Sequence, residues 1–267
     1  MRSSRLFITN IFLCGSILSI QASGRQKSFN SNAGIPIKTI KLRNDQDTNT
    51  PNEQKKSTKK VVHFIRHAEG LHNIAGEKDY SAYERQEFYD CALSEHGEQQ
   101  CALQRERCQT LLQNAQLVVT SPLQRTLQTA SLVLPFLEGN VPWLALDSIR
   151  ETTGLHPCDK RRPRSEKMTQ PEFKHIDFSF IENDYDFLYD HYTVREPEAH
   201  VASRARNFFD WLETRKETEV VVVTHSAFLR TLFTHVVECD DADKEKYENC
   251  EVRSYILEIP SRHRMES

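Results

Sequence analysis

The run Val220–Thr224, four consecutive valines and a threonine, constrains the fold more than any other part of the sequence. β-branched residues favour strands, and a strand that is apolar throughout must be covered on both faces. Such strands occur in parallel sheets with helices on both sides. A helical pattern follows at 227–237, so this strand and helix form one unit of an alternating β/α chain.

Other short strands and helices alternate in the same way along the chain. The expected strands are 61–65, 117–120, 143–146 and 252–259, the last of them an edge strand. The expected helices are 94–114 with Ser94 as N-cap, 121–134 with Pro122 in the first turn, and 198–214. This order predicts a three-layer α/β/α fold whose mostly parallel sheet could carry an antiparallel edge strand.

Composition and charge are those of an ordinary globular protein. The 267 residues are 38% hydrophobic and 27% charged, with a formal net charge of −3. This balance excludes a disordered or fibrous chain, and it argues against nucleic-acid binding through a broad basic face. No apolar run is long enough to cross a bilayer, so we expect no membrane association of the mature chain.

The cysteines do not have the spacing of a disulfide scaffold or of a C-x-x-C zinc site. Cys14 falls in the N-terminal apolar run. Cys101 and Cys108 lie two turns apart on the same expected helix, too distant to bridge each other. We interpret the six cysteines beyond that run as mostly buried thiols.

The N-terminal segment has the pattern of a presequence. Arg2 and Arg5 precede the largely apolar run 6–20, and small residues follow at 22–24. A basic start, a short apolar core and a small-residue exit are typical of a secretory signal peptide, so we expect 1–22 to be one. A buried N-terminal helix is the alternative.

The next segment, 23–60, is basic and polar. It contains no acidic residue between 23 and 44, a composition that resembles an organellar transit peptide. Plastid import through a bipartite presequence is therefore an alternative to the secretory pathway, as is a cytoplasmic location. We expect a flexible linker or transit segment at 23–60, the folded domain at 61–260 and a short tail at 261–267.

Four motifs with reactive side chains follow the ends of expected strands. They are R-H-A-E-G-L-H-N at 66–73, S-P-L-Q-R-T-L-Q-T-A at 121–130, I-R-E-T-T-G at 149–154 and T-H-S-A-F-L-R at 224–230. The carboxyl ends of parallel strands lie at one edge of a sheet, where ligands bind. We therefore expect two histidines, His67 and His225, to face one crevice together with Arg66, Arg125 and Glu151.

The other histidines of the first strand and loop have simpler interpretations. His63 and His67 are about 13 Å apart along a strand, too far to share a metal ion. We interpret His63 as a strand histidine bonded to a neighbour and His72 as a solvated loop residue.

The four motifs, in this order over 61–237, resemble the histidine phosphatase superfamily, the phosphoglycerate mutase-like clan. The segments G-L-H-P-C-D-K-R-R, H-I-D-F-S, R-E-P and F-x-x-W-L are similar, more narrowly, to the phosphoglycerate mutase-like proteins of plants, algae and fungi. Two positions depart from the family pattern: Ala68 and Ser226 follow histidines that mutases usually follow with glycine. Both residues are small, so we expect the pocket to be preserved.

The resemblance implies a role for each motif residue. His67 would attack phosphorus and form a phosphohistidine, Glu151 would protonate the leaving group, and His225 would stabilise the transferring group. The phosphoryl group would be bound by Arg66, Asn73, Arg125 and Ser226. Arginine pairs well with a phosphomonoester dianion, so the implied substrate is a small phosphomonoester and no metal or other cofactor is expected.

Two other functions remain open beside this metal-independent phosphatase. A phosphoglycerate mutase would return the phosphoryl group to its substrate, but the long insertion and closing tail of the mutases are missing. A non-enzymatic interaction module would have lost at least one catalytic residue, and none is lost. The sequence leaves the natural substrate and the oligomeric state open.

The insertion 155–195 contains a basic cluster whose role the sequence does not decide. The cluster consists of Lys160, Arg161, Arg162 and Arg164. It could bind a second anionic group of the substrate. Alternatively it is a solvated loop balanced by the nearby acids Asp177, Glu182, Asp184, Asp186 and Asp190.

Overall fold

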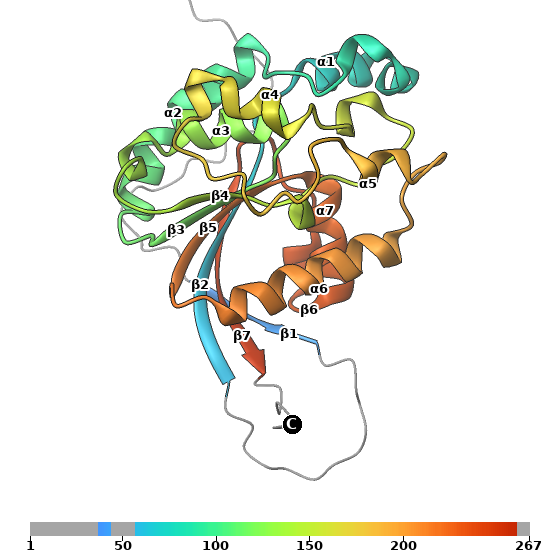
Figure 1. The fold of residues 1–267 in the computed structure, drawn as a ribbon. Coiled ribbons are helices and arrows are strands. Elements are labelled where there is room, and N and C mark those ends of the chain that lie inside the picture. Colours follow the sequence, from blue (N-terminus) through green and yellow to red (C-terminus); the bar gives the residue numbers. More distant parts are fainter. Residues whose placement is uncertain (1–36, 44–56, 261–267) are drawn as a thin grey trace, which may run out of the picture. The chain divides into compact units, whose positions relative to one another are not determined.

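The computed structural model describes residues 37–43 and 57–260. They form a seven-stranded mixed sheet with the strand order β4-β3-β5-β2-β7-β1-β6 (Figure 1). The strands are β1 (Lys38–Leu42), β2 (Ser57–Arg66), β3 (Leu117–Thr120), β4 (Trp143–Ala145), β5 (Glu219–Thr224), β6 (Val237–Glu238) and β7 (Val252–Pro260). β2, β3, β4 and β5 are mutually parallel, as the alternation of strands and helices predicts.

Helices cover both faces of the sheet, which confirms the three-layer α/β/α fold. α2 (Glu95–Leu111) and α3 (Gln124–Val133) pack on one face, and α6 (Glu198–Thr214) and α7 (Ser226–Thr231) on the other (Figure 1). Alternate valines of β5 point into the two layers, and all are fully buried. The shorter helices are α1 (Leu71–Lys78), α4 (Arg164–Thr169) and α5 (Phe187–Asp190), and α7 continues into a π-helical turn, Leu232–Val236.

Most predicted elements are confirmed, including the N-cap of α2, where the Ser94 hydroxyl accepts the Gly97 N–H at 2.9 Å. The start of α3 differs from the prediction. The helix begins at Gln124, so Pro122 precedes it instead of occupying its first turn. The reason is that the chain stays extended past β3: the Ser121 N–H still donates to the Val223 carbonyl of β5, at 3.0 Å.

The prediction that 252–259 forms an edge strand is wrong. β7 lies inside the sheet, antiparallel to β2 on one side and parallel to β1 on the other. β1 comes from segment 23–60, where a flexible linker or transit segment was expected, and β2 also begins inside that segment. The buried side chains of Ile40 and Leu42 hold β1 in the core, although polar neighbours mask them in the sequence. The antiparallel edge strand is β6, paired with β1.

The predicted presequence 1–22 and tail 261–267 lie outside the described residues. Within the described ranges, no helix has both the length and the apolar character needed to span a bilayer. The six cysteines there are free thiols, and five of them are buried, which confirms their interpretation.

Candidate active site

Two histidines meet at the ends of β2 and β5 because these strands are parallel neighbours. Arg66 pairs with Thr224 in the register of the two strands, so the next residue on each is a histidine. The His67 N–H donates to the Thr224 carbonyl at 2.9 Å. The ring centroids of His67 and His225 are 5.1 Å apart. The structure thus brings together the two imidazoles that the sequence analysis placed in one crevice.

His67 is held as a neutral imidazole with a defined proton. Its Nδ1 lies 2.7 Å from the Ala68 carbonyl oxygen, which can only accept, so Nδ1 carries the hydrogen. Nε2 keeps its lone pair and accepts from the Arg125 Nε–H at 3.3 Å. Burial, then the guanidinium groups of Arg125 and Arg66, lower the pKa of His67 well below 6.5. Nε2 is therefore available as a nucleophile near neutral pH.

His225 is fully buried, and one of its ring nitrogens has no partner. Its Nε2 lies 2.7 Å from the Ser121 hydroxyl, whereas Nδ1 makes no hydrogen bond within the described structure. Burial, followed by the charge of Arg125, lowers the pKa of His225 well below 6.5. When Ser121 donates to Nε2, the ring proton resides on Nδ1. A buried N–H without an acceptor is costly, and a ligand oxygen would satisfy it.

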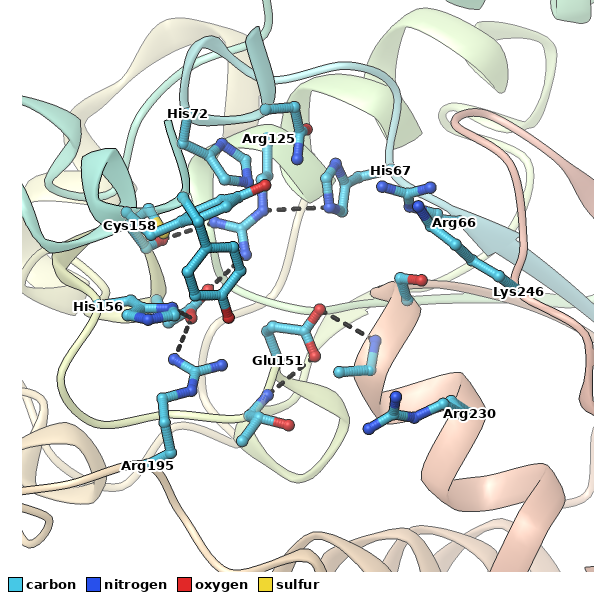
Figure 2. A pocket seen from close by; sticks show the side chains of 17 residues that line it. Arg66, His67, His72, Arg125, Glu151, His156, Cys158, Arg195, Arg230 and Lys246 are labelled. Atoms are coloured by element: carbon cyan, nitrogen blue, oxygen red, sulfur yellow. Dashed lines mark hydrogen bonds and ion pairs between the residues drawn. The ribbon is translucent and has the colours of Figure 1, made fainter. Parts of the chain in front are cut away.

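Arg125 projects from α3 and is held on three sides. Besides His67, its guanidinium donates to the Cys158 carbonyl at 2.6 Å and to the Asp159 carboxylate at 2.9 Å. The other oxygen of Asp159 accepts from Arg195 at 2.7 Å. Burial alone would raise the pKa of Asp159, but Arg195 and Arg125 hold it below its ordinary value. Asp159 thus orients two arginines in the pocket with one buried carboxylate (Figure 2).

Arg66, the last residue of β2, approaches the site from the other side of His67 (Figure 2). One terminal nitrogen donates to the Tyr247 carbonyl at 2.8 Å, while its buried Nε has no partner among the residues that the structure describes. Arg66 and Arg125 therefore flank His67 with cationic N–H donors. This arrangement suits an oxyanion with charge spread over several oxygens.

Glu151 lies across the cavity from His67, between Arg195 and Arg230 (Figure 2). Three backbone N–H groups hold its carboxylate: Oε1 accepts from Thr152 at 2.9 Å and Phe228 at 3.0 Å, and Oε2 accepts from Ala227 at 3.1 Å. Oε2 has one such donor, so it retains more capacity to exchange a proton with a ligand.

The cavity that these groups line has a volume of about 530 Å³. Asn73 and Ser226 also line it; the Asn73 side-chain oxygen accepts the Gly70 N–H at 2.9 Å and so caps α1. Besides His72 and Cys158, eight more polar or aromatic side chains were not assigned to the site from sequence: Tyr80, Tyr83, Thr152, His156, Asp159, Arg195, Arg230 and Lys246. The motifs G-L-H-P-C-D and R-E-P, noted above only as a resemblance, contain three of them.

One histidine interpretation is confirmed and the other is wrong. The His63 ring bonds to the Ser254 hydroxyl at 2.7 Å and to Glu219 at 3.2 Å, outside the cavity. His72, expected to be solvated, is buried in the cavity wall, with its ring 5.8 Å from that of His67. It lies in the first turn of α1, and that turn packs against the segment carrying Cys91, whose sulfur lies 3.1 Å from Nδ1 of His72.

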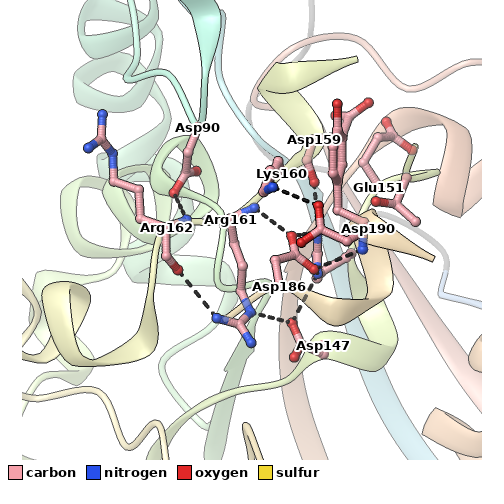
Figure 3. A network of polar contacts seen from close by, with 12 residues as sticks. Asp90, Asp147, Glu151, Asp159, Lys160, Arg161, Arg162, Asp186 and Asp190 are labelled. Carbon is pink, nitrogen blue, oxygen red and sulfur yellow. Dashed lines mark hydrogen bonds and ion pairs between the residues drawn. The ribbon is translucent and has the colours of Figure 1, made fainter. Parts of the chain in front are cut away.

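The basic cluster of the insertion is not part of the described cavity lining. Figure 3 shows the polar network that contains Lys160, Arg161 and Arg162. Arg161 is buried and donates to Asp147 and to backbone carbonyls of 183–185. Lys160 pairs with Asp190 at 2.7 Å, and Arg162 with Glu166 at 3.1 Å. These cations stabilise the folded insertion, so of the two alternatives the structure favours the loop balanced by nearby acids.

Comparison with known proteins identifies the family. The model of the histidine phosphatase superfamily (branch 1) matches residues 62–264. The chain belongs to this superfamily. Membership supports a phosphatase or mutase activity for the site described above. Within the described ranges, no group of three or more His, Cys, Asp and Glu side chains is placed to hold a metal ion.

Relatives of this chain include two proteins of Arabidopsis thaliana. This chain is 38% identical over 231 residues to a "phosphoglycerate mutase-like protein". The match covers 74% of this chain and 84% of the relative. The same identity holds for "phosphoglycerate mutase-like protein 1", with 81% of the relative covered. Phosphoglycerate mutase from Bacillus anthracis str. Sterne shares the fold, with a TM-score of 0.50, 19% identity, and coverage of 77% of this chain and 92% of that chain.

Replacing Asp159 with asparagine tests the role of the buried carboxylate. We expect Asp159→Asn to lower the free energy of unfolding by about 3 kcal/mol or more, because the buried charge of Arg125 loses its counter-ion. The matched control is Asp190→Asn, which disrupts an exposed pair with Lys160 and should cost less than about 1 kcal/mol. Urea denaturation of both variants measures the difference. Equal losses would contradict the role assigned to Asp159.

The protonation of His67 and His225 can be measured directly. Because the pKa of His67 and of His225 is lowered well below 6.5, both rings should stay neutral in the ligand-free protein at about pH 6. The unfolded chain binds protons there, so stability should fall as the pH drops below about 6.5. Side-chain ¹H–¹⁵N NMR across this range reports both rings, and should show the His67 hydrogen on Nδ1. Titration of either ring at or above pH 6.5 would contradict this assignment.

Proposed function

We propose that this chain is a phosphatase that hydrolyses small phosphomonoesters through a phosphohistidine on His67, without a metal ion. The observation that carries the proposal is the pair of buried, neutral imidazoles 5.1 Å apart, flanked by Arg66 and Arg125. The Nε2 lone pair of His67 accepts only from Arg125, and Nδ1 of His225 has no partner among the described residues, so the two rings are suited to different tasks.

In the first step, Nε2 of His67 forms a bond to phosphorus as the phosphorus–oxygen ester bond breaks. Arg66 and Arg125 balance the charge of the phosphoryl oxygens, and Arg125 gives up its contact with Nε2 to an incoming oxygen. Nδ1 of His225 donates to an equatorial oxygen, where negative charge is stabilised in the transition state. Asn73 and Ser226 complete the binding of the phosphoryl group.

Glu151 handles the protons of both steps. In the first step its carboxylic acid protonates the departing alkoxide, and in the second its carboxylate accepts a proton from water. The water oxygen then bonds to phosphorus, the phosphorus–nitrogen bond breaks, and inorganic phosphate and a neutral imidazole result. The three backbone N–H groups fix the carboxyl group on the side of the cavity where the ester oxygen would lie.

Phosphoglycerate mutase-type transfer is the second candidate, favoured by 38% identity to two proteins named phosphoglycerate mutase-like. The same phosphohistidine would then pass its phosphoryl group back to a bound hydroxyl instead of to water. A non-enzymatic interaction module has less support, because Arg66, His67, Arg125 and Glu151 all line one cavity. The fifth side chain, His225, is buried behind the lining, with its ring centroid 5.1 Å from that of His67.

Turnover of phosphomonoesters in the presence of EDTA tests the proposal. The protein should release phosphate from p-nitrophenyl phosphate and from glycerol 3-phosphate, and His67→Ala should abolish both activities. Glu151→Gln should slow the alkyl ester by about 10²- to 10⁴-fold and the nitrophenyl ester less, because nitrophenolate leaves without protonation. His96→Ala, on the exposed surface, is the control.

Each outcome of this test has a definite meaning. Full activity in His67→Ala, or complete loss of activity in EDTA, would overturn the mechanism. Interconversion of 2- and 3-phosphoglycerate that depends on a bisphosphate primer, and outpaces phosphate release, would favour the mutase. Mass spectrometry of enzyme that is quenched rapidly and without acid should show one added phosphoryl group. This group should be absent in His67→Ala.

We also propose that the protein enters the secretory pathway, with plastid import or a cytoplasmic location as alternatives. The support is the sequence pattern of residues 1–24, basic start, apolar core and small-residue exit. A fluorescent protein fused behind residues 1–60 should enter the secretory pathway, and the same fusion without residues 1–22 should not. A diffuse cytosolic signal from the full fusion would overturn the proposal.

A further inference from the structure

We propose that the active-site cavity contains a second anion subsite formed by Arg230 and Lys246. The substrates would then be small phosphomonoesters that carry a second anionic group, a carboxylate or another phosphate. This inference rests on the proposed phosphatase function and adds the chemical class of its substrate.

The charge of the cavity exceeds what one phosphoryl group needs. Its lining contains five cationic side chains, Arg66, Arg125, Arg195, Arg230 and Lys246, against the carboxylates of Glu151 and Asp159. Asp159 already pairs with Arg125 and Arg195. With a phosphoryl dianion between Arg66 and Arg125, the described lining would still carry a net charge of +1, and Arg230 and Lys246 would lack a direct counter-charge. A second anionic group on the ligand would supply it.

Arg230 is directed into this cavity by the geometry of α7. Ser226 and Arg230 are four residues apart, on the same side of the helix, and both line the cavity. Phe228 and Leu229, on the opposite side, are fully buried in the core and fix the rotation of the helix. Within the described ranges, the Arg230 guanidinium has neither a hydrogen bond nor an ion pair, so its donors are available to a ligand.

Lys246 is positioned by a tightly held loop between β6 and β7. The Arg253 guanidinium lies 4.0 Å from the centroid of the Tyr247 ring and donates to the carbonyls of Asp243, Glu245 and Lys246. The Tyr247 carbonyl in turn accepts from Arg66. The backbone of Lys246 is thereby tied to the phosphoryl-binding arginine.

The side chain of Lys246 lies beside Arg66 at the cavity wall (Figure 2). In the part of the chain that the structure describes, its ammonium group has no acceptor. Arg230 and Lys246 are thus two cations on the wall of one cavity whose donors a ligand can satisfy.

Matched substrates that differ in one anionic group test the subsite. The carboxylate arm compares 3-phosphoglycerate with glycerol 3-phosphate, and the phosphate arm compares fructose 1,6-bisphosphate with fructose 6-phosphate. In at least one arm, kcat/KM should be about tenfold or more higher for the doubly anionic compound, as expected for charge-assisted hydrogen bonds. This preference should decrease as the salt concentration rises.

The double variant Arg230→Gln/Lys246→Gln should reduce the preference to about threefold or less. The matched control, Arg107→Gln/Lys174→Gln, removes one exposed arginine and one exposed lysine that do not line the cavity, and should keep the preference. Calorimetry on the His67→Ala background measures the same preference as a ratio of Kd values, independently of turnover.

The two readouts separate failure of the subsite from failure of the proposed function. Turnover with equal kcat/KM for both members of each pair, or a preference that survives in the double variant, would overturn the subsite. If no phosphomonoester is hydrolysed but the calorimetric preference is present and lost in the double variant, the phosphatase proposal fails and the anion subsite stands. Absence of any preference in binding would overturn the subsite regardless of activity.

Discussion

The parallel pairing of β2 with β5 is the constraint on which the rest of the site depends. Its register sets Arg66 opposite Thr224 and therefore places His67 and His225 side by side where the strands end. A shift of one residue would turn one histidine to the other face of the sheet. The valines of β5, buried in both helical layers, make such a shift costly because every side chain would change layers.

Around this pair, the structure buries charge in a way that prepares the chemistry. Burial and neighbouring guanidinium groups keep both imidazoles neutral, while Asp159 compensates the buried charge of Arg125. An uncompensated guanidinium at this depth would be strongly destabilising. The donors are thus oriented before any ligand arrives, and preorganised donors are more effective than donors that must reorganise during the reaction.

The insertion between β4 and α6 has two separate roles. Its basic residues mostly pair with acids or backbone carbonyls of the insertion itself, and so maintain its fold. Its other members, His156, Asp159 and Arg195, face the cavity. Charge composition alone cannot separate these roles, because a paired arginine and a ligand-binding arginine look identical in sequence. What separates them is which carboxylates and carbonyls the folded loop brings within hydrogen-bonding distance.

The alternation of strands and helices was sufficient to predict the layered fold. The motifs at strand ends were sufficient to predict that His67 and His225 lie close together. Both predictions follow from local sequence patterns and from the common direction of parallel strands. Three features required the tertiary structure. The formation of β1 depends on the burial of two apolar side chains in a polar segment. The burial of His72 beside His67 depends on how α1 packs. The pairing of Arg125 with Asp159 depends on contacts between segments that are distant in sequence. Sequence determines which residues follow each strand; only packing decides which charges become neighbours, because that depends on three-dimensional distance.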